Sequence, residues 1–395
     1  MNQVLRRVVA GECPSMLLPI EAVNRIEEDF RLEARHKSEA AEGGLTFKVG
    51  AFPSYRPRAR HRMGRRLLAL GILLGLSALG ATATASGQSS HDPDPAAPVL
   101  QPSQMAKAPP LDPHPVVALT FDDLPAAGSL PPGQSRTKIA ATLAAELVSN
   151  HLAGTYGFVN SAKLQNDPDA RQALHLWVDA GMNIGSHTWS HLSLTANTAE
   201  AFEKEIALNE PALIQYAGKR DWHWFRYPYL WEGDTLDKRR AVRTYLHEHG
   251  YQVAQVTLDF EDYAWNDTYA RCSAKQDDAA ITWLKQSYLD TAAEYIRLGR
   301  EESQIAFGRE IPNVMLLHAT AFTTLMLPDL LRLLQEQGFR FASLPEVEKD
   351  PAYALDPDAA LKYGGTLPDQ FMDSRHLPYP RVGPKPFDKL KDLCR

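Results

Sequence analysis

Residues 116–123 read Val-Val-Ala-Leu-Thr-Phe-Asp-Asp, and they indicate how the chain folds. The first six residues carry no charge, which is typical of a strand buried on both faces of a parallel sheet. Two carboxylates follow at once, so Asp122 and Asp123 lie at the carboxyl end of this expected strand. Because β/α folds gather functional side chains at such strand ends, the stretch predicts a site beside these two residues.

Strands and helices alternate from this first strand onward, with strand starts every roughly 30–40 residues, the size of a βα unit. At three helix-to-strand junctions, Gly181, Gly250 and Gly338 are suited to the left-handed conformation that ends a helix. The expected strands cover residues 116–121, 155–159, 182–185, 222–227, 251–258, 314–317 and 339–343, and the expected helices cover 135–150, 169–180, 199–216, 235–249 and 327–337.

This pattern predicts an α/β fold, a deformed (β/α) barrel with about seven strands, as a single catalytic domain over residues 115–349. A doubly wound open sheet uses the same local pattern and is the alternative. Residues 264–312 depart from the repeat, and we expect a long helix over 277–307 to shape one side of the cleft. Residues 350–395 are rich in proline, and we expect this extension to pack on the barrel surface.

The composition is that of an ordinary globular protein, with 395 residues, 44% hydrophobic and 23% charged. The formal net charge of −6 argues against nucleic-acid binding, which usually needs a basic face. Nothing in the sequence indicates an obligate protein partner, and we expect a monomer.

An export signal is predicted within the chain rather than at its start. Residues 63–85 combine a basic Arg65-Arg66 pair, an apolar run over 67–81 and small residues suited to cleavage. We therefore expect a periplasmic or extracellular protein. Residues 1–62 are interpreted as a mis-assigned leader, the alternative being a cytoplasmic extension before a membrane anchor. Residues 86–114 are expected to be a flexible linker.

Export changes how the cysteines are interpreted. Outside the doubtful leader the chain has only Cys272 and Cys394, an even pair in an oxidising compartment. We expect a disulfide between them. Two unpaired structural cysteines are the alternative, because two sequence positions do not define a geometry.

A metal site is predicted from two histidines and one carboxylate. On a helix or tight turn, the four-residue spacing of His187 and His191 places both rings on one face. Together with Asp123 they make a two-nitrogen, one-oxygen set with open positions, as expected of a catalytic metal. Zn²⁺ is the default expectation, and Co²⁺ or another divalent ion also suits such ligands.

Acid–base groups are predicted at other strand ends. His318 follows an apolar strand and is placed to act as a general acid, with Asp262 hydrogen-bonded to it to select its tautomer. Arg226 is expected to pair with Asp122 and keep it ionised as a base. The alternatives are a capped core histidine for His318 and a surface ion pair for Arg226.

Five short motifs now stand in one order along the chain: Thr120-Phe121-Asp122-Asp123, His187-Thr188-Trp189-Ser190-His191, Arg226-Tyr227-Pro228-Tyr229, Asp259-Phe260-Glu261-Asp262-Tyr263 and Leu316-Leu317-His318. Over roughly residues 116–344 this set resembles the polysaccharide deacetylase family, the NodB homology domain of carbohydrate esterase family 4. The resemblance implies a deformed (β/α) barrel and a metal-dependent hydrolase that removes acetyl groups from N-acetylated or O-acetylated carbohydrate polymers.

The resemblance also implies a role for each matching residue. Asp122 corresponds to the base, and Asp123, His187 and His191 correspond to the metal ligands. Arg226 would orient Asp122, the Tyr229 backbone N–H would help to hold the oxyanion, and Asp262 would tune the acid His318.

The chain departs from the family at Tyr263, which stands where the family usually has tryptophan, and Trp265 is a candidate substitute. Trp222, Trp224 and Trp231 are further candidates for stacking on sugar rings. Two alternatives to the deacetylase remain, a small-molecule amidohydrolase on the same barrel and a carbohydrate-binding protein with a decayed site. An open groove would favour a polymer, and a closed pocket would favour a metabolite.

Overall fold

The computed structural model describes residues 111–395. The expected leader, the signal peptide and most of the linker lie outside the described residues. Within residues 111–395, no helix is both long enough and apolar enough to cross a membrane.

Within residues 111–395, seven parallel strands and the helices between them follow the expected alternation. The strands are β1 (Val116–Leu124), β2 (Tyr156–Val159), β3 (Asn183–Ser186), β4 (Trp224–Phe225), β5 (Gln252–Val253), β6 (Asn313–His318) and β7 (Arg340–Phe341). The main helices are α4 (Arg136–Ser149), α5 (Pro168–Asp179), α6 (Ala199–Ala217), α7 (Leu236–Glu248), α8 (Asn266–Lys275), α9 (Asp278–Phe307) and α10 (Ala321–Glu336).

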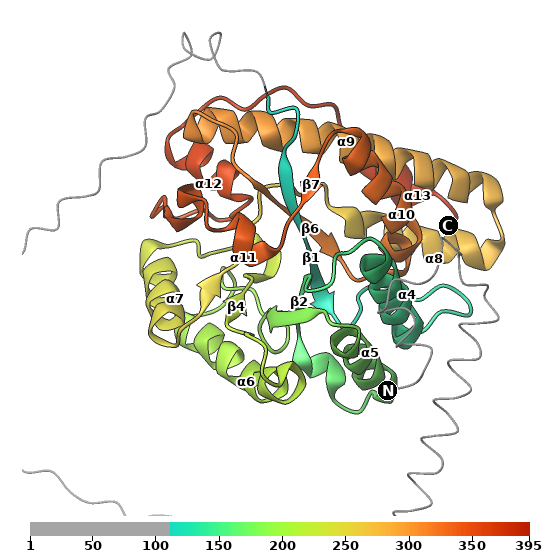
Figure 1. Cartoon of the computed structure of the whole chain (residues 1–395), viewed down its shortest axis with the longest axis horizontal. Coiled ribbons are helices and arrows are strands. Elements are labelled where there is room, and N and C mark those ends of the chain that lie inside the picture. Colours follow the sequence, from blue (N-terminus) through green and yellow to red (C-terminus); the bar gives the residue numbers. More distant parts are fainter. Residues whose placement is uncertain (1–110) are drawn as a thin grey trace, which may run out of the picture. The chain divides into compact units, whose positions relative to one another are not determined.

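The sheet curls into an incomplete barrel, which confirms the deformed barrel over the open-sheet alternative. The strand order is β5-β4-β3-β2-β1-β6, with β7 paired to the start of β1. The chain that leaves β5 reaches β6, where Leu258 pairs with Met315 and the Leu316 N–H donates to the Leu258 carbonyl. Helices α4 to α7 flank one half of this curled sheet, and α9 runs along the other (Figure 1).

Local signals account for most helix boundaries. Ser135, Thr198 and Thr235 cap α4, α6 and α7 with their hydroxyls, and the three junction glycines have positive φ as predicted. The expected start of the helix over 327–337 was wrong, because α10 begins six residues earlier, where the Thr320 hydroxyl accepts from the Thr323 N–H. Helix α8, which follows the fourth motif, was not predicted.

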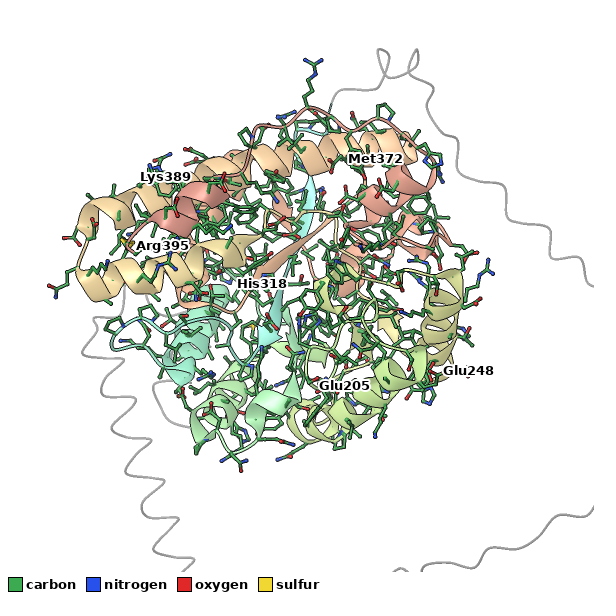
Figure 2. The ribbon with its side chains drawn as sticks, turned by 180° about the vertical axis from the view of Figure 1, so that it is seen from behind. Glu205, Glu248, His318, Met372, Lys389 and Arg395 are labelled. Atoms are coloured by element: carbon green, nitrogen blue, oxygen red, sulfur yellow. A yellow bond between two sulfur atoms is a disulfide. The ribbon has the colours of Figure 1, made fainter. Side chains whose placement is uncertain are left out.

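The C-terminal residues pack along α9 rather than continuing the barrel. Helix α12 (Leu367–Ser374) lies against α9, with the Phe307 and Phe371 rings 5.1 Å apart. Helix α13 (Phe387–Asp392) follows, and Figure 2 shows Arg395 beside α8 and α9. A disulfide joins Cys272 of α8 to Cys394, which confirms the predicted pairing.

Candidate active site

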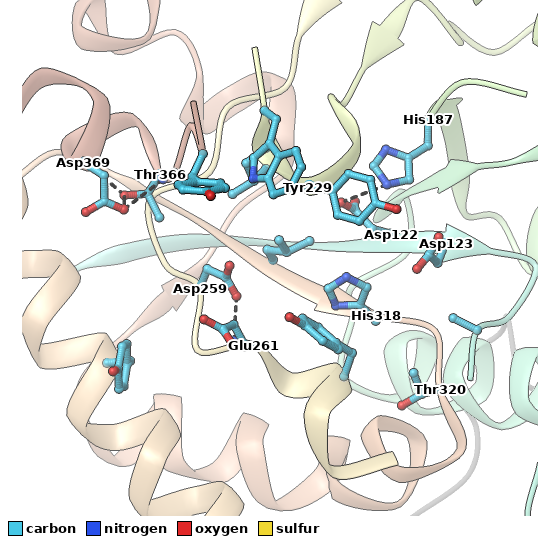
Figure 3. A pocket seen from close by; sticks show the side chains of 18 of the residues that line it. Asp122, Asp123, His187, Tyr229, Asp259, Glu261, His318, Thr320, Thr366 and Asp369 are labelled. Atoms are coloured by element: carbon cyan, nitrogen blue, oxygen red, sulfur yellow. Dashed lines mark hydrogen bonds and ion pairs between the residues drawn. The ribbon is translucent and has the colours of Figure 1, made fainter. Parts of the chain in front are cut away.

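The two carboxylates at the end of β1 both reach one cleft, as predicted. Asp122 is 2% exposed and is the register partner of His318 on the neighbouring strand β6. Asp123 has φ 69°, a left-handed turn that departs from the alternation of a regular strand. Because of this turn, consecutive aspartates line the same cavity (Figure 3).

His187 and His191 lie on a loop after β3, not on a helix. Thr188 and His191 have φ of 61° and 65°, and this tight turn brings the two imidazole rings to 4.8 Å between centroids. The His187 Nδ1 lies 2.8 Å from the carbonyl oxygen of Arg226, so Nε2 is the nitrogen left to face the cleft. Asn160, which the sequence reasoning missed, supports the turn by donating to the carbonyl oxygens of His187 and Thr188.

The three predicted ligands converge on one point. One ligand atom from each of Asp123, His187 and His191 lies within 4.8 Å of the other two. Burial lowers the pKa of His187 to about 3 and that of His191 to about 4, so both rings are neutral, the form that binds metal. Two neutral imidazoles and one carboxylate fit a tetrahedral divalent ion with a free position.

Lys163 is a cation beside this cluster that the sequence reasoning missed. It lies in a short 3₁₀ turn (Ser161–Leu164) after β2 and donates to both the carbonyl oxygen and Oδ1 of Asp123, each at 3.0 Å. Burial by itself would raise the pKa of Asp123, but Lys163 and the nearby histidines outweigh burial and hold that pKa well below its usual range. The Asp123 carboxylate is therefore ionised.

Arg226 is 1% exposed, which excludes the surface ion pair. Its Nη1 lies 3.1 Å from Asp122 Oδ1, as predicted, and its Nε donates to the Ala254 carbonyl oxygen at 2.6 Å. Burial raises the pKa of Asp122 more than Arg226 lowers it. Arg226 therefore orients Asp122, while burial makes this carboxylate a stronger base than an exposed aspartate.

His318 and Asp262 form the predicted pair at the end of β6. The His318 Nδ1 lies 2.7 Å from Asp262 Oδ1, while Asp262 Oδ2 accepts from the His318 N–H at 3.0 Å and from the Thr323 hydroxyl at 2.6 Å. Burial by itself would lower the pKa of His318, but Asp262 outweighs it and raises the pKa to about 9. His318 is therefore protonated at neutral pH, with Nε2 left to donate a proton.

The aromatic residues around the site differ in part from the expectation. Trp265 is fully buried against Tyr288, and its indole N–H donates to Ser287, so the prediction that it forms the groove wall was wrong. Tyr263 lines the cleft instead, with its ring 5.0 Å from that of His318. Trp224 is a core residue.

The cleft extends well beyond these residues and encloses about 600 Å³. Helix α9 lines one side with Tyr295 and Glu302, as expected of the inserted helix. Figure 3 shows Asp123 and His187 toward one end and Asp369 at the other. The half-exposed Tyr229 ring lies 4.4 Å from that of His191, and the site is open to solvent at this side.

The comparisons with known proteins agree with the motifs. Residues 111–254 match the family model described as polysaccharide deacetylase. This matched range contains the first three motifs. The fourth and fifth motifs lie outside this match, and the fold brings them to the same cleft. No curated protein is significantly similar to the chain in sequence.

Several solved structures are similar in fold. A CE4 family pseudoenzyme from Bacillus anthracis is 14% identical with a TM-score of 0.41, covering 59% of this chain and 65% of its own. The chitin deacetylase from the fungal pathogen Colletotrichum lindemuthianum is 20% identical with a TM-score of 0.40, covering 59% and 88%. A family 4 carbohydrate esterase from Streptomyces lividans, in complex with acetate, is 20% identical with a TM-score of 0.38, covering 59% and 95%.

Proposed function

We propose that this chain, whose residues 111–254 match the polysaccharide deacetylase family, is a metal-dependent hydrolase that removes acetyl groups from carbohydrate polymers. One observation carries the proposal. The cluster of Asp123, His187 and His191, the buried base Asp122 and the paired acid His318 all face one cleft. Nucleophile activation and leaving-group protonation require these three functions side by side.

Asp123, His187 and His191 would hold the metal. When bound, a divalent ion such as Zn²⁺ lowers the pKa of water and polarises the acetyl carbonyl. Asp122 is placed to take the proton of the attacking water. Its Oδ1 is held by Arg226, and its Oδ2 lies 3.6 Å from His187 Nε2, on the side of the ligand cluster.

His318 is placed to protonate the leaving group. Asp262 holds Nδ1, so the proton passes from Nε2 to the departing amine or alcohol of the sugar, and acetate is released. The Tyr229 backbone N–H is the proposed donor to the oxyanion. Tyr229 has φ 63°, in the left-handed region, and its ring lies 4.4 Å from that of His191.

Acetate release from N-acetylated and O-acetylated polysaccharides tests the function. The purified full chain is assayed with chelator and after adding back Zn²⁺ or Co²⁺, beside the variant Asp122→Asn. Acetate that appears only with metal and is lost in the variant supports the proposal. Metal binding without acetate from any polymer refutes it and favours a small-molecule amidohydrolase.

We also propose that the protein is exported and works as a monomer in the periplasm or outside the cell. The signal-like residues 63–85 and the disulfide between Cys272 and Cys394 support export, because disulfides persist in oxidising compartments. N-terminal sequencing of the natural protein tests this: a start near residue 86 is expected, and a start upstream of Met63 contradicts it.

A further inference from the structure

Three aromatic side chains form a continuous surface that leads away from the ligand cluster. We call Tyr229, Trp231 and Tyr363 the aromatic platform. The Tyr229 and Trp231 rings are 4.8 Å apart at an interplanar angle of 32°, and Trp231 and Tyr363 are 5.5 Å apart. All three line the cleft, and Tyr229 and Tyr363 are 52% and 63% exposed. Exposed rings of this size in a cleft leave apolar surface for a ligand.

A close approach of two backbones builds the platform. Gly364 has φ 53°, and a Cβ at this position would lie 1.9 Å from the Leu230 carbonyl oxygen and 3.1 Å from the Trp231 Cα. Only glycine permits this approach, so the C-terminal segment lies directly on residues 230–231. Tyr363 is thereby fixed beside Trp231, although 132 positions separate them (363 minus 231).

A buried polar network joins the two segments that carry the platform. Glu232, which follows Trp231, is 3% exposed and lies 3.1 Å from Arg239 Nη1. It also accepts from Gln255 at 3.0 Å and from Gln370 of α12 at 2.9 Å. A ligand surface held in this way binds without first being ordered, which favours affinity.

Polar groups lie along the same cleft. Thr366 and Asp369 are at the end far from Asp123, and Asp259 lies between the two ends (Figure 3). Carboxylates accept hydrogen bonds from hydroxyl groups, and aromatic faces pack against apolar surface. A pyranose ring offers a partner to each of these groups, because its faces carry C–H groups and its edge carries hydroxyls.

We propose that the aromatic platform binds the sugar unit next to the one that carries the acetyl group, and that Tyr363 is a specificity-determining residue, which makes turnover depend on the length of the substrate. This inference rests on the proposed function and narrows it. Tyr363 lies outside residues 111–254, so a part of the chain beyond the family match contributes to the choice of substrate.

Chain-length dependence of the metal-loaded enzyme tests the platform. The probes are N-acetylglucosamine oligomers and acetylated xylo-oligomers of one to five units, with acetate release as the readout. We expect kcat/KM of the wild type to rise with length. In Tyr363→Ala, the ratio of kcat/KM for the tetramer to that for the monomer should fall about 3- to 10-fold, the loss expected for one stacked ring.

Two further variants make the result specific. Tyr363→Phe keeps the ring and should keep the length dependence, while Ile214→Ala removes an exposed apolar side chain, 55% exposed, on α6 and should behave as the wild type. A tetramer-to-monomer ratio in Tyr363→Ala equal to that of the wild type overturns the platform, even if the enzyme is active.

Measuring oligomer binding distinguishes the proposal of the aromatic platform from the proposed deacetylase activity, even when no activity is detected. The same oligomers are titrated by calorimetry into Asp122→Asn and into the double variant Asp122→Asn, Tyr363→Ala. Length-dependent binding that Tyr363→Ala weakens supports the platform even if no acetate is ever released. Metal-dependent acetate release without any dependence on length overturns the platform and leaves the deacetylase intact.

Discussion

The ammonium of Lys163 lies 3.0 Å from Asp123 Oδ1, and the same oxygen lies 3.8 Å from His191 Nε2. A divalent ion held by Asp123 and the two histidines would therefore sit close to this lysine. Two cations beside one carboxylate oxygen repel each other, and the partly buried setting screens them less than water does. Lys163 is thus expected to lower the affinity of the cluster for metal.

Replacing this lysine should tighten metal binding. We expect Lys163→Met to bind Zn²⁺ at least about 10-fold more tightly than the wild type, because the metal then no longer competes with a hydrogen bond between charged groups, which contributes about 1.5–3 kcal/mol. Calorimetric titration of the chelator-treated protein measures the change. Lys204→Met, an exposed lysine on α6, is the matched control and should leave affinity unchanged. Weaker binding by Lys163→Met would instead show that the lysine orients Asp123 for the metal.

Substituting each of the two neighbouring aspartates by asparagine should have a different effect. Asp122→Asn cannot take a proton, so kcat should fall at least about 100-fold while Zn²⁺ remains bound. Asp123→Asn removes a charged ligand, so Zn²⁺ affinity should fall at least about 10-fold. Metal content after dialysis and kcat at saturating metal distinguish them. Loss of metal from Asp122→Asn would contradict the assignment of Asp122 as base.

The predicted site residues came together because their signal is local. Most of the motifs lie at the carboxyl end of a strand, and a curled parallel sheet brings these ends to one face whatever lies between them in the sequence. The exact position of the Asp123 carboxylate depends on a positive φ, which the motif allows but does not specify. Arg226 illustrates the same limit, since its pairing was predictable and its complete burial was not.

Residues outside the motifs were missed because only the fold brings them to the site. Lys163 and Tyr363 are ordinary surface residue types in the sequence, and their positions follow from the turn after β2 and from the approach of Gly364 to Leu230. The prediction for Trp265 was wrong because the fold takes this residue away from the site. It stands two residues after Tyr263, and the 3₁₀ turn over Asp262–Trp265 carries it into the core.

The pH dependence of activity should reveal the pairing of His318 with Asp262. An acid must be protonated, so activity is expected to fall as pH rises through the His318 pKa of about 9. Asp262→Asn removes the charge that raises this pKa. The alkaline limb of kcat/KM should therefore move to lower pH by at least about one unit. Thr323→Val, which removes a different partner of Asp262, is the control and should shift the limb less. An alkaline limb that stays in place in Asp262→Asn would show that another group sets it.

The disulfide should stabilise the domain through the length of chain that it closes. Cys272 and Cys394 are 122 positions apart, so the bond restricts a large part of the unfolded chain. We expect Cys272→Ser with Cys394→Ser to lower the free energy of unfolding by about 2–5 kcal/mol, measured by urea titration with and without reductant. Reductant should destabilise the wild type to the same level and leave the double variant unchanged. Equal stability of the oxidised wild type and the double variant would show that packing of α13 against Trp265, whose ring lies 6.3 Å from that of Phe387, suffices to hold the C-terminus.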